Sequence, residues 1–76
     1  MKELLTYIAQ SLVDHPEQVA VTEHVDDGET TLELRVASDD MGKVIGRQGR
    51  IAKWIRILMR SVAQRSGTRV SVEISD

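Results

Sequence analysis

The sequence predicts an α+β domain in which three helices cover one face of a three-stranded mixed sheet. Three segments carry apolar residues at helical spacing, three others alternate apolar and polar residues, and their order along the chain is α-β-β-α-α-β. A chain of 76 residues is expected to form one domain, residues 1–76, around a modest core. That core should be aliphatic, because the chain has one Trp, one Tyr and no Phe.

A helix is expected first, over residues 2–14, where leucine and isoleucine recur at helical spacing. Pro16 should end this helix, because a residue that precedes proline avoids helical geometry. A β-hairpin is expected next, with strands near residues 19–24 and 30–37. The Asp-Gly pair at 27–28 suits the turn between them, in which both central residues need positive φ.

A short helix should follow the hairpin and stop at Gly46. Ser38 suits its N-cap, and Asp39 and Asp40 would then lie in its first turn, where carboxylates complement the helix dipole. A second, longer helix is expected to begin near Gly49.

This longer helix should end near residue 65, because the glycine at 67 suits the left-handed position just beyond a helix end. One of its faces is apolar on a helical wheel: Ile51, Ile55, Leu58, Met59 and Val62. A last strand over residues 68–75 should turn three apolar side chains inward: Val70, Val72 and Ile74. The two-helix connection is long enough to return this strand parallel to the second strand by a right-handed crossover.

Charge is divided unevenly along the chain. The net charge is −2, but residues 43–72 contain eight basic residues and no acidic one, while the rest contains two basic and all twelve acidic residues. Such a division indicates a surface that faces a polyanion on an otherwise acidic protein. The alternative is a solvated helix face that happens to be basic, and Lys53, Arg56 and Arg60 fit that interpretation.

The tetrapeptide Gly46-Arg47-Gln48-Gly49 joins the two predicted helices tightly. Its glycines allow positive φ and a close approach of another backbone. The following helix directs its N-terminus at this loop, where unpaired N–H groups and the positive end of the dipole favour an anion. Three basic residues surround that point: Lys43, Arg47 and Arg50. A phosphodiester backbone suits the site better than a single metabolite, because the positive charge extends along the helix.

The hexapeptide at 44–49, Val-Ile-Gly-Arg-Gln-Gly, resembles the V-I-G-x-x-G signature of the KH domain, whose GXXG loop clamps about four nucleotides of a nucleic-acid backbone. The order of helices and strands is similar to the type II form of that fold. The resemblance covers all 76 residues, and the segment MGKVIGRQGRIAKWIR is close to the bacterial KhpA family of small single-domain RNA-binding proteins.

The resemblance implies roles for individual residues. Gly46, Arg47, Gln48 and Gly49 would hold phosphates through backbone N–H groups, while Val44 and Ile45 would line an apolar floor under the bases; Lys43, Arg47 and Arg50 would add positive charge. The two strand residues that could join this floor, Leu34 and Val36, alternate as core residues and are assigned to the core first.

The resemblance also implies partners and a cellular role. The expected partners are single-stranded RNA and a second copy of the chain, a KhpB (Jag-like) protein, or both. The expected role is that of a cytoplasmic RNA chaperone and post-transcriptional regulator that affects cell shape and cell wall biogenesis. Single-stranded DNA stays open as a ligand, because no residue clearly engages a 2′-hydroxyl.

Two apolar residues of the longer helix, Trp54 and Ile57, lie close to its basic residues in the sequence. Trp54 is expected to cover the edge of the core, whereas Ile57, surrounded by charge, suits an interface. Together with Lys53 they are candidates for contact with RNA or with a second protein chain. The alternative function is therefore a KH-fold dimerisation or protein-interaction module with little RNA affinity of its own.

Other classes of function find no support in the sequence. There is no cysteine, and His15 and His24 lack partners at metal-ligand spacing, so no metal or cofactor is expected. No nucleophile has a base beside it, and the glycine loop lacks the residues of a nucleotide-binding loop, so neither an enzyme nor a small-molecule substrate is expected. No run of 18 apolar residues indicates a membrane span, and no signal peptide is recognised.

Overall fold

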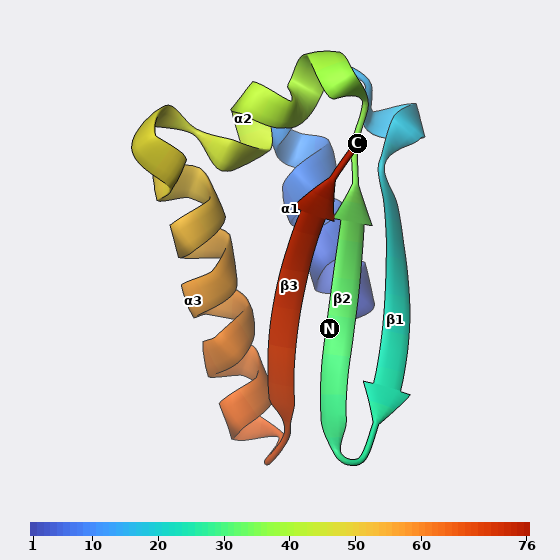
Figure 1. The fold of residues 1–76 in the computed structure, drawn as a ribbon, viewed down its shortest axis with the longest axis vertical. Coiled ribbons are helices and arrows are strands. Elements are labelled where there is room, and N and C mark those ends of the chain that lie inside the picture. Colours follow the sequence, from blue (N-terminus) through green and yellow to red (C-terminus); the bar gives the residue numbers. More distant parts are fainter.

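The computed structural model describes all 76 residues, and it confirms the predicted order of helices and strands (Figure 1). The regular elements are α1 Lys2–Leu12, β1 Ala20–Asp26, β2 Glu29–Arg35, α2 Met41–Ile45, α3 Arg50–Arg65 and β3 Arg69–Ser75. A single 3-10 turn precedes each of β1, α2 and α3: Pro16–Gln18, Ser38–Asp40 and Arg47–Gly49.

The strands form one mixed sheet in the order β1-β2-β3, with β1 and β2 antiparallel and β2 and β3 parallel. Val21 lies opposite Leu34, and Leu32 lies opposite Val72. Because side chains alternate across a strand, this register places the apolar residues of all three strands on one face. The predicted mixed sheet is therefore confirmed.

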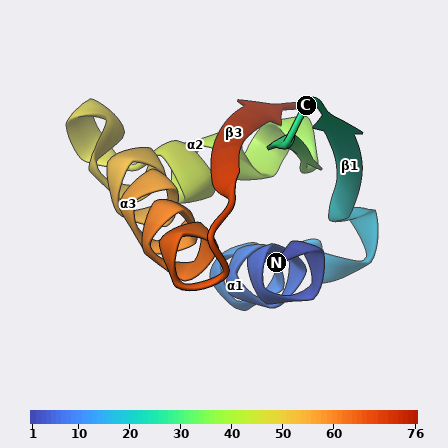
Figure 2. The same ribbon diagram turned by 90° about the horizontal axis from the view of Figure 1, so that it is seen from below.

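All helices lie on that apolar side of the sheet (Figure 2). The long helix α3 runs beside β3, α1 packs against β1 and β2, and α2 crosses the end of the sheet at which β2 and β3 finish (Figure 1). The opposite face of the sheet carries no helix. This arrangement puts the connection between α2 and α3 at one corner of the molecule, away from the acidic hairpin.

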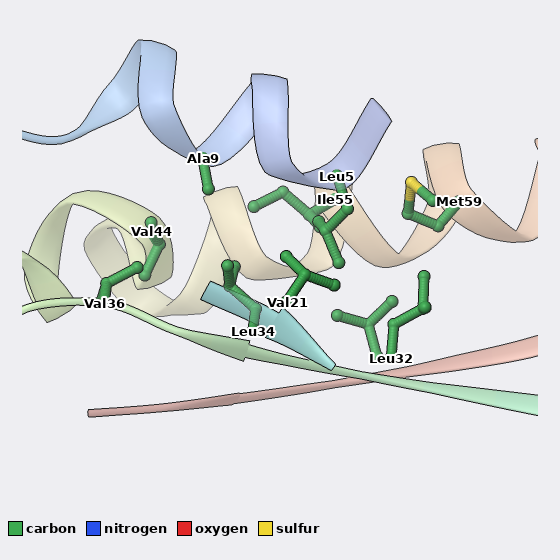
Figure 3. Close-up of a cluster of buried hydrophobic side chains, with 10 residues drawn as sticks. Leu5, Ala9, Val21, Leu32, Leu34, Val36, Val44, Ile55 and Met59 are labelled. Atoms are coloured by element: carbon green, nitrogen blue, oxygen red, sulfur yellow. The ribbon is translucent and has the colours of Figure 1, made fainter. Parts of the chain in front are cut away.

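The core between the sheet and the helices consists of aliphatic side chains and one methionine, with no aromatic ring, as expected from the composition (Figure 3). It is made of ten buried side chains: Leu5, Ala9, Val21, Leu32, Leu34, Val36, Val44, Ile55, Met59 and Val72. Removing such side chains from water is the main favourable contribution to folding, about 25 cal/mol for each Å² of apolar surface. The burial of Leu34 and Val36 confirms their assignment to the core.

The predicted turns take the expected conformations. Asp27 and Gly28 have φ values of 52° and 79°, which gives the two positive values that a tight hairpin turn needs. Gly67 has φ 71° just beyond α3, and the backbone N–H of Thr68 donates to the Ala63 carbonyl at 2.9 Å. This is the hydrogen bonding of a glycine-terminated helix.

Two expectations for the first helix and its neighbour are wrong. Helix α1 ends at Leu12 and not at residue 14, because Val13 is extended. Ser38 makes no capping hydrogen bond. Asp39 and Asp40 do lie in the first turn after β2, as predicted, but Asp40 has a further role. Its side chain is buried and accepts hydrogen bonds from the backbone N–H groups of Asp14 and His15, at 3.1 and 3.0 Å. Asp40 thus fastens the segment after α1 to the start of α2.

The predicted apolar face of α3 is wrong at one position. Leu58 is 44 % exposed, and the residues that α3 buries are Ala52, Ile55, Met59 and Ala63. The buried stripe of α3 thus includes two alanines that the prediction did not contain. Leu58 lies at the edge of this buried stripe, and its side chain is partly exposed to solvent.

A pair of valine substitutions tests the position of the core. Val44 is fully buried and Val25 is 69 % exposed. We expect Val44→Ala to lower the free energy of unfolding by about 2 kcal/mol, since two methyl groups leave a packed interior, and Val25→Ala to change it by less than about 0.5 kcal/mol. Urea denaturation followed by circular dichroism measures both. Equal effects of the two substitutions would contradict this packing.

Candidate nucleic-acid interface

The loop between α2 and α3 takes a conformation that few sequences allow. Gly46 has φ 78° and ψ 174°, Gln48 has φ 58°, and Gly49 has φ 74°. Positive φ is readily adopted by glycine and tolerated by few other residues. The Gly46 N–H donates to the Gly42 carbonyl at 2.9 Å, and the Gly49 N–H donates to the Gly46 carbonyl at 3.2 Å. The loop is therefore a defined turn.

The two glycines serve different purposes. A Cβ at Gly46 would lie 2.6 Å from Ile51 Cγ1 and 2.9 Å from the Ile51 backbone nitrogen. The first turn of α3 can therefore pack this close to residue 46 only because that residue is a glycine. A Cβ at Gly49 would meet no atom within 4 Å. Gly46 is thus required for packing inside the protein, whereas Gly49 leaves open space on the outer side of the loop.

The positive charge at this open space comes from Arg47 and Arg50. Both side chains are exposed, and neither forms an ion pair with a carboxylate of the chain. The first turn of α3 adds backbone N–H groups and the positive end of its dipole. The loop, the two arginines and the helix N-terminus together suit an anion.

Lys43 lies close in sequence to the loop, but its ammonium is held by two carboxylates. Its ammonium lies 2.9 Å from an Asp14 carboxylate oxygen and 3.9 Å from an Asp40 carboxylate oxygen. The hydrogen bond from Lys43, and then its charge, lower the pKa of Asp14; the hydrogen bond to Asp14, and then its charge, raise the pKa of Lys43. Lys43 is therefore engaged by carboxylates of the chain, whereas Arg47 and Arg50 are not.

The two apolar residues before Gly46 also differ in position. Ile45 is half-buried and retains surface beside the loop. Val44 is fully buried in the core, so it has no surface on which a base could lie (Figure 3). The expectation that Val44 lines a floor under bases is corrected: it supports Ile45 and the loop from below.

A narrow groove of about 130 Å³ runs between α3 and the edge strand β3, and it was not predicted from the sequence. It is lined by Arg56, Arg60, Val70, Ser71 and Val72. The Arg56 Nε–H donates to the Val72 carbonyl at 3.2 Å, which holds this arginine against the strand. The basic residues at positions 56 and 60 were the sole indication of this groove in the sequence, and they fitted a solvated helix face equally well.

The outer face of α3 carries the remaining candidates. Lys53, Trp54 and Ile57 lie beside Arg50 around a shallow depression of about 450 Å³. Trp54 is 68 % exposed, so it does not cover the edge of the core as expected. Exposed aromatic and aliphatic side chains next to cations suit contact with a second macromolecule.

The chain contains no group of three or more His, Cys, Asp or Glu residues that could hold a metal ion. None of its helices is long and apolar enough to cross a membrane.

Comparison with known proteins agrees with the resemblance seen in the sequence. A family model described as KhpA/KhpB, KH domain, matches residues 2–74. The RNA-binding protein KhpA of Clostridium acetobutylicum is 54 % identical over 74 residues, which cover 97 % of this chain and 99 % of that protein. The RNA-binding protein KhpA of Halalkalibacterium halodurans is 49 % identical over 76 residues, the full length of both chains.

Two solved structures share the fold at low sequence identity. Era of Aquifex aeolicus, in a point variant bound to GDP.AlF4-, superposes with a TM-score of 0.68 at 21 % identity, and the match covers 97 % of this chain but 29 % of that one. Era in complex with MgGDPNP and nucleotides 1506–1542 of 16S ribosomal RNA gives a TM-score of 0.66 at 21 % identity, covering 97 % and 28 % of the two chains. The likeness concerns the fold alone.

Alanine substitutions at the two loop glycines should differ in cost. Gly46→Ala combines the strain of positive φ with a clash against Ile51, and we expect it to lower the free energy of unfolding by about 3 kcal/mol or more. Gly49→Ala carries the backbone strain alone, about 1 kcal/mol. Chemical denaturation of both variants checks this order, and a larger loss for Gly49→Ala would show that the loop packs differently.

Proposed function

The chain belongs to the KhpA/KhpB family of KH domains, and from this premise we propose that it binds single-stranded RNA and has no catalytic activity of its own. The observation that carries the proposal is the open side of the Gly46–Gly49 loop, where Arg47 and Arg50 have no carboxylate partner. Two or so phosphates would be held there by backbone N–H groups and the two guanidinium groups.

The bases would then lie on the apolar and polar surface next to the loop. Ile45 offers a half-buried apolar edge, and further along α3 the groove between α3 and β3 presents Arg56, Arg60 and Ser71. No aromatic ring lines that groove. Since stacking on aromatic rings contributes about 1–3 kcal/mol per base, we expect weak binding with little sequence preference.

The finer role follows the family. We place the protein in the cytoplasm, as an RNA chaperone and post-transcriptional regulator connected with cell shape and peptidoglycan homeostasis, and acting with a KhpB-type partner. Membership of the family supports this role.

Self-association is the second part of the proposal. Trp54, Ile57 and Leu58 expose apolar surface on α3, and a second copy packed against this helix would remove it from water. Homodimers are the commonest oligomers, and so small a domain gains stability from pairing. The same surface supports the alternative function, a protein-interaction module with little RNA affinity. Two binding loops in one dimer would raise avidity without new contacts.

The RNA-binding site is tested by charge reversal at the loop. We expect Arg47→Asp/Gln48→Asp to weaken binding of a labelled single-stranded RNA 10-mer at least about tenfold, measured by fluorescence anisotropy, because two new carboxylates face the phosphates. For the native protein, raising salt from about 50 to 200 mM should weaken binding about sevenfold if two phosphates are neutralised.

The chain provides a matched control at the other end of α3. Gln64→Asp/Arg65→Asp makes the same change of residues and charge at exposed positions far from the loop, and it should weaken binding much less. Circular dichroism verifies that all variants fold. Equal losses for both double variants would contradict the loop site, and equal binding of DNA of the same sequence would extend the ligand to single-stranded nucleic acid in general.

The dimer is tested separately by sedimentation velocity. Trp54→Ala/Ile57→Ala should shift the protein toward the monomer at a given concentration, because it removes apolar surface from the interface. The control Tyr7→Ala/Val25→Ala removes exposed apolar side chains from other faces and should leave the association unchanged. Native protein that stays monomeric at all concentrations would rule out the homodimer.

A further inference from the structure

Lys43 is the one basic residue close to the loop that carboxylates hold on both sides. Its ammonium lies 2.9 Å from Asp14, which follows α1, and 3.9 Å from Asp40, which precedes α2. Arg47 and Arg50 have no such partners. The chain therefore neutralises one cation beside its proposed RNA site and leaves two available.

The two carboxylates have different roles in the fold. Asp40 is buried, with 1 % of its side chain exposed, and it accepts the backbone N–H groups of Asp14 and His15. Its loss would leave two donors without a partner. The Asp14 side chain is 70 % exposed, and Lys43 is the partner of its carboxylate. The Asp14 carboxylate can thus be removed without loss of a backbone hydrogen bond.

The position of Lys43 on α2 puts it within reach of the loop. Gly46 lies three residues further on, and residues three apart are neighbours on one face of a helix. Helical side chains lean toward the helix N-terminus, which directs Lys43 to Asp40 and Asp14 and away from the loop. Its flexible four-carbon stem allows the ammonium to turn toward a phosphate at the loop once Asp14 no longer holds it, because Asp40 is more distant, at 3.9 Å, and already accepts two backbone N–H groups.

From this geometry we propose that Asp14 limits the RNA affinity of the protein by holding the Lys43 ammonium, so that Lys43 is a latent phosphate contact. A phosphate at the loop must displace the Asp14 carboxylate before it gains Lys43, and the exchange of one anion for another contributes little. When the Asp14 charge is absent, the same lysine becomes a full contact. The inference rests on the proposed RNA-binding function.

The experiment compares four proteins by fluorescence anisotropy with a single-stranded RNA 10-mer over a range of salt: Asp14→Asn, Lys43→Met, the double variant and the native chain. We expect Asp14→Asn to bind the RNA about two- to fivefold more tightly than the native chain. The slope of log affinity against log salt concentration should become steeper by about 0.7, the value for one added phosphate contact. In the Lys43→Met background, Asp14→Asn should lose most of this gain.

Asp39→Asn is the control for charge alone. Asp39 is exposed near the same turn and forms no ion pair with Lys43, so its loss removes one negative charge without releasing the lysine. It should give a smaller gain in affinity and an unchanged salt slope.

An NMR titration adds a readout without RNA. The pKa of Asp14 lies below its ordinary value in the native chain and should rise in Lys43→Met, because the hydrogen bond and the attraction to Lys43 are gone.

The outcomes separate the two proposals. If the native chain binds RNA but Asp14→Asn matches Asp39→Asn, or keeps its full gain in the Lys43→Met background, this inference is wrong while the proposed function stands. An Asp14 pKa that is insensitive to Lys43→Met also overturns it. If no variant binds RNA, the proposed function fails and the inference fails with it.

Discussion

The contact between the Gly46 backbone and Ile51 is the constraint on which the rest of the site depends. Ile51 lies where a Cβ of residue 46 would have to be, so the chain can turn from α2 into α3 here only with glycine. That close turn aims the first N–H groups of α3 at the same point as the guanidinium groups of Arg47 and Arg50. It also lets Ala52 and Ile55 reach the sheet, which joins the loop to the hydrophobic core. Loop geometry and domain stability therefore have a common origin.

Charge is arranged by the fold as much as by the sequence. The acidic residues are concentrated in the first half of the chain, and the structure places two of them, Asp14 and Asp40, against Lys43 at the start of α2. On the loop side of α2 the cations have no carboxylate partners. A nucleic acid that approaches this corner thus meets positive charge at the loop and along α3, and negative charge beyond α2. The electrostatic field of this charge distribution orients an approaching polyanion at long range, and the field weakens as the salt concentration rises.

Local patterns were sufficient to predict the element order, the hairpin turn and the glycine loop. Each depends on residues close together in the chain, such as the Asp-Gly pair at 27–28 or the alternation of β2. The errors came from contacts between distant residues. Asp40 bonds to backbone groups 25 and 26 positions away and so fixes the segment after α1, in which Asp14 holds the Lys43 ammonium. Likewise, Arg56 reaches Val72 across 16 positions, and the burial of Ala52 and Ala63 in place of Leu58 is set by how α3 packs in the domain. The spacing of apolar residues within one helix gives no information about these contacts with distant residues.

The central claim is that the Gly46–Gly49 loop is the point at which the chain holds a nucleic-acid backbone. The most direct measurement is a titration of ¹⁵N-labelled protein with a single-stranded RNA 10-mer, followed by amide chemical shifts. Our account predicts that the amides of Arg47, Gln48, Gly49 and Arg50 shift first and furthest, with smaller changes along the groove between α3 and β3. Shifts confined to Trp54 and the outer face of α3, with the loop amides unmoved, would contradict it and would favour the role of an interaction module.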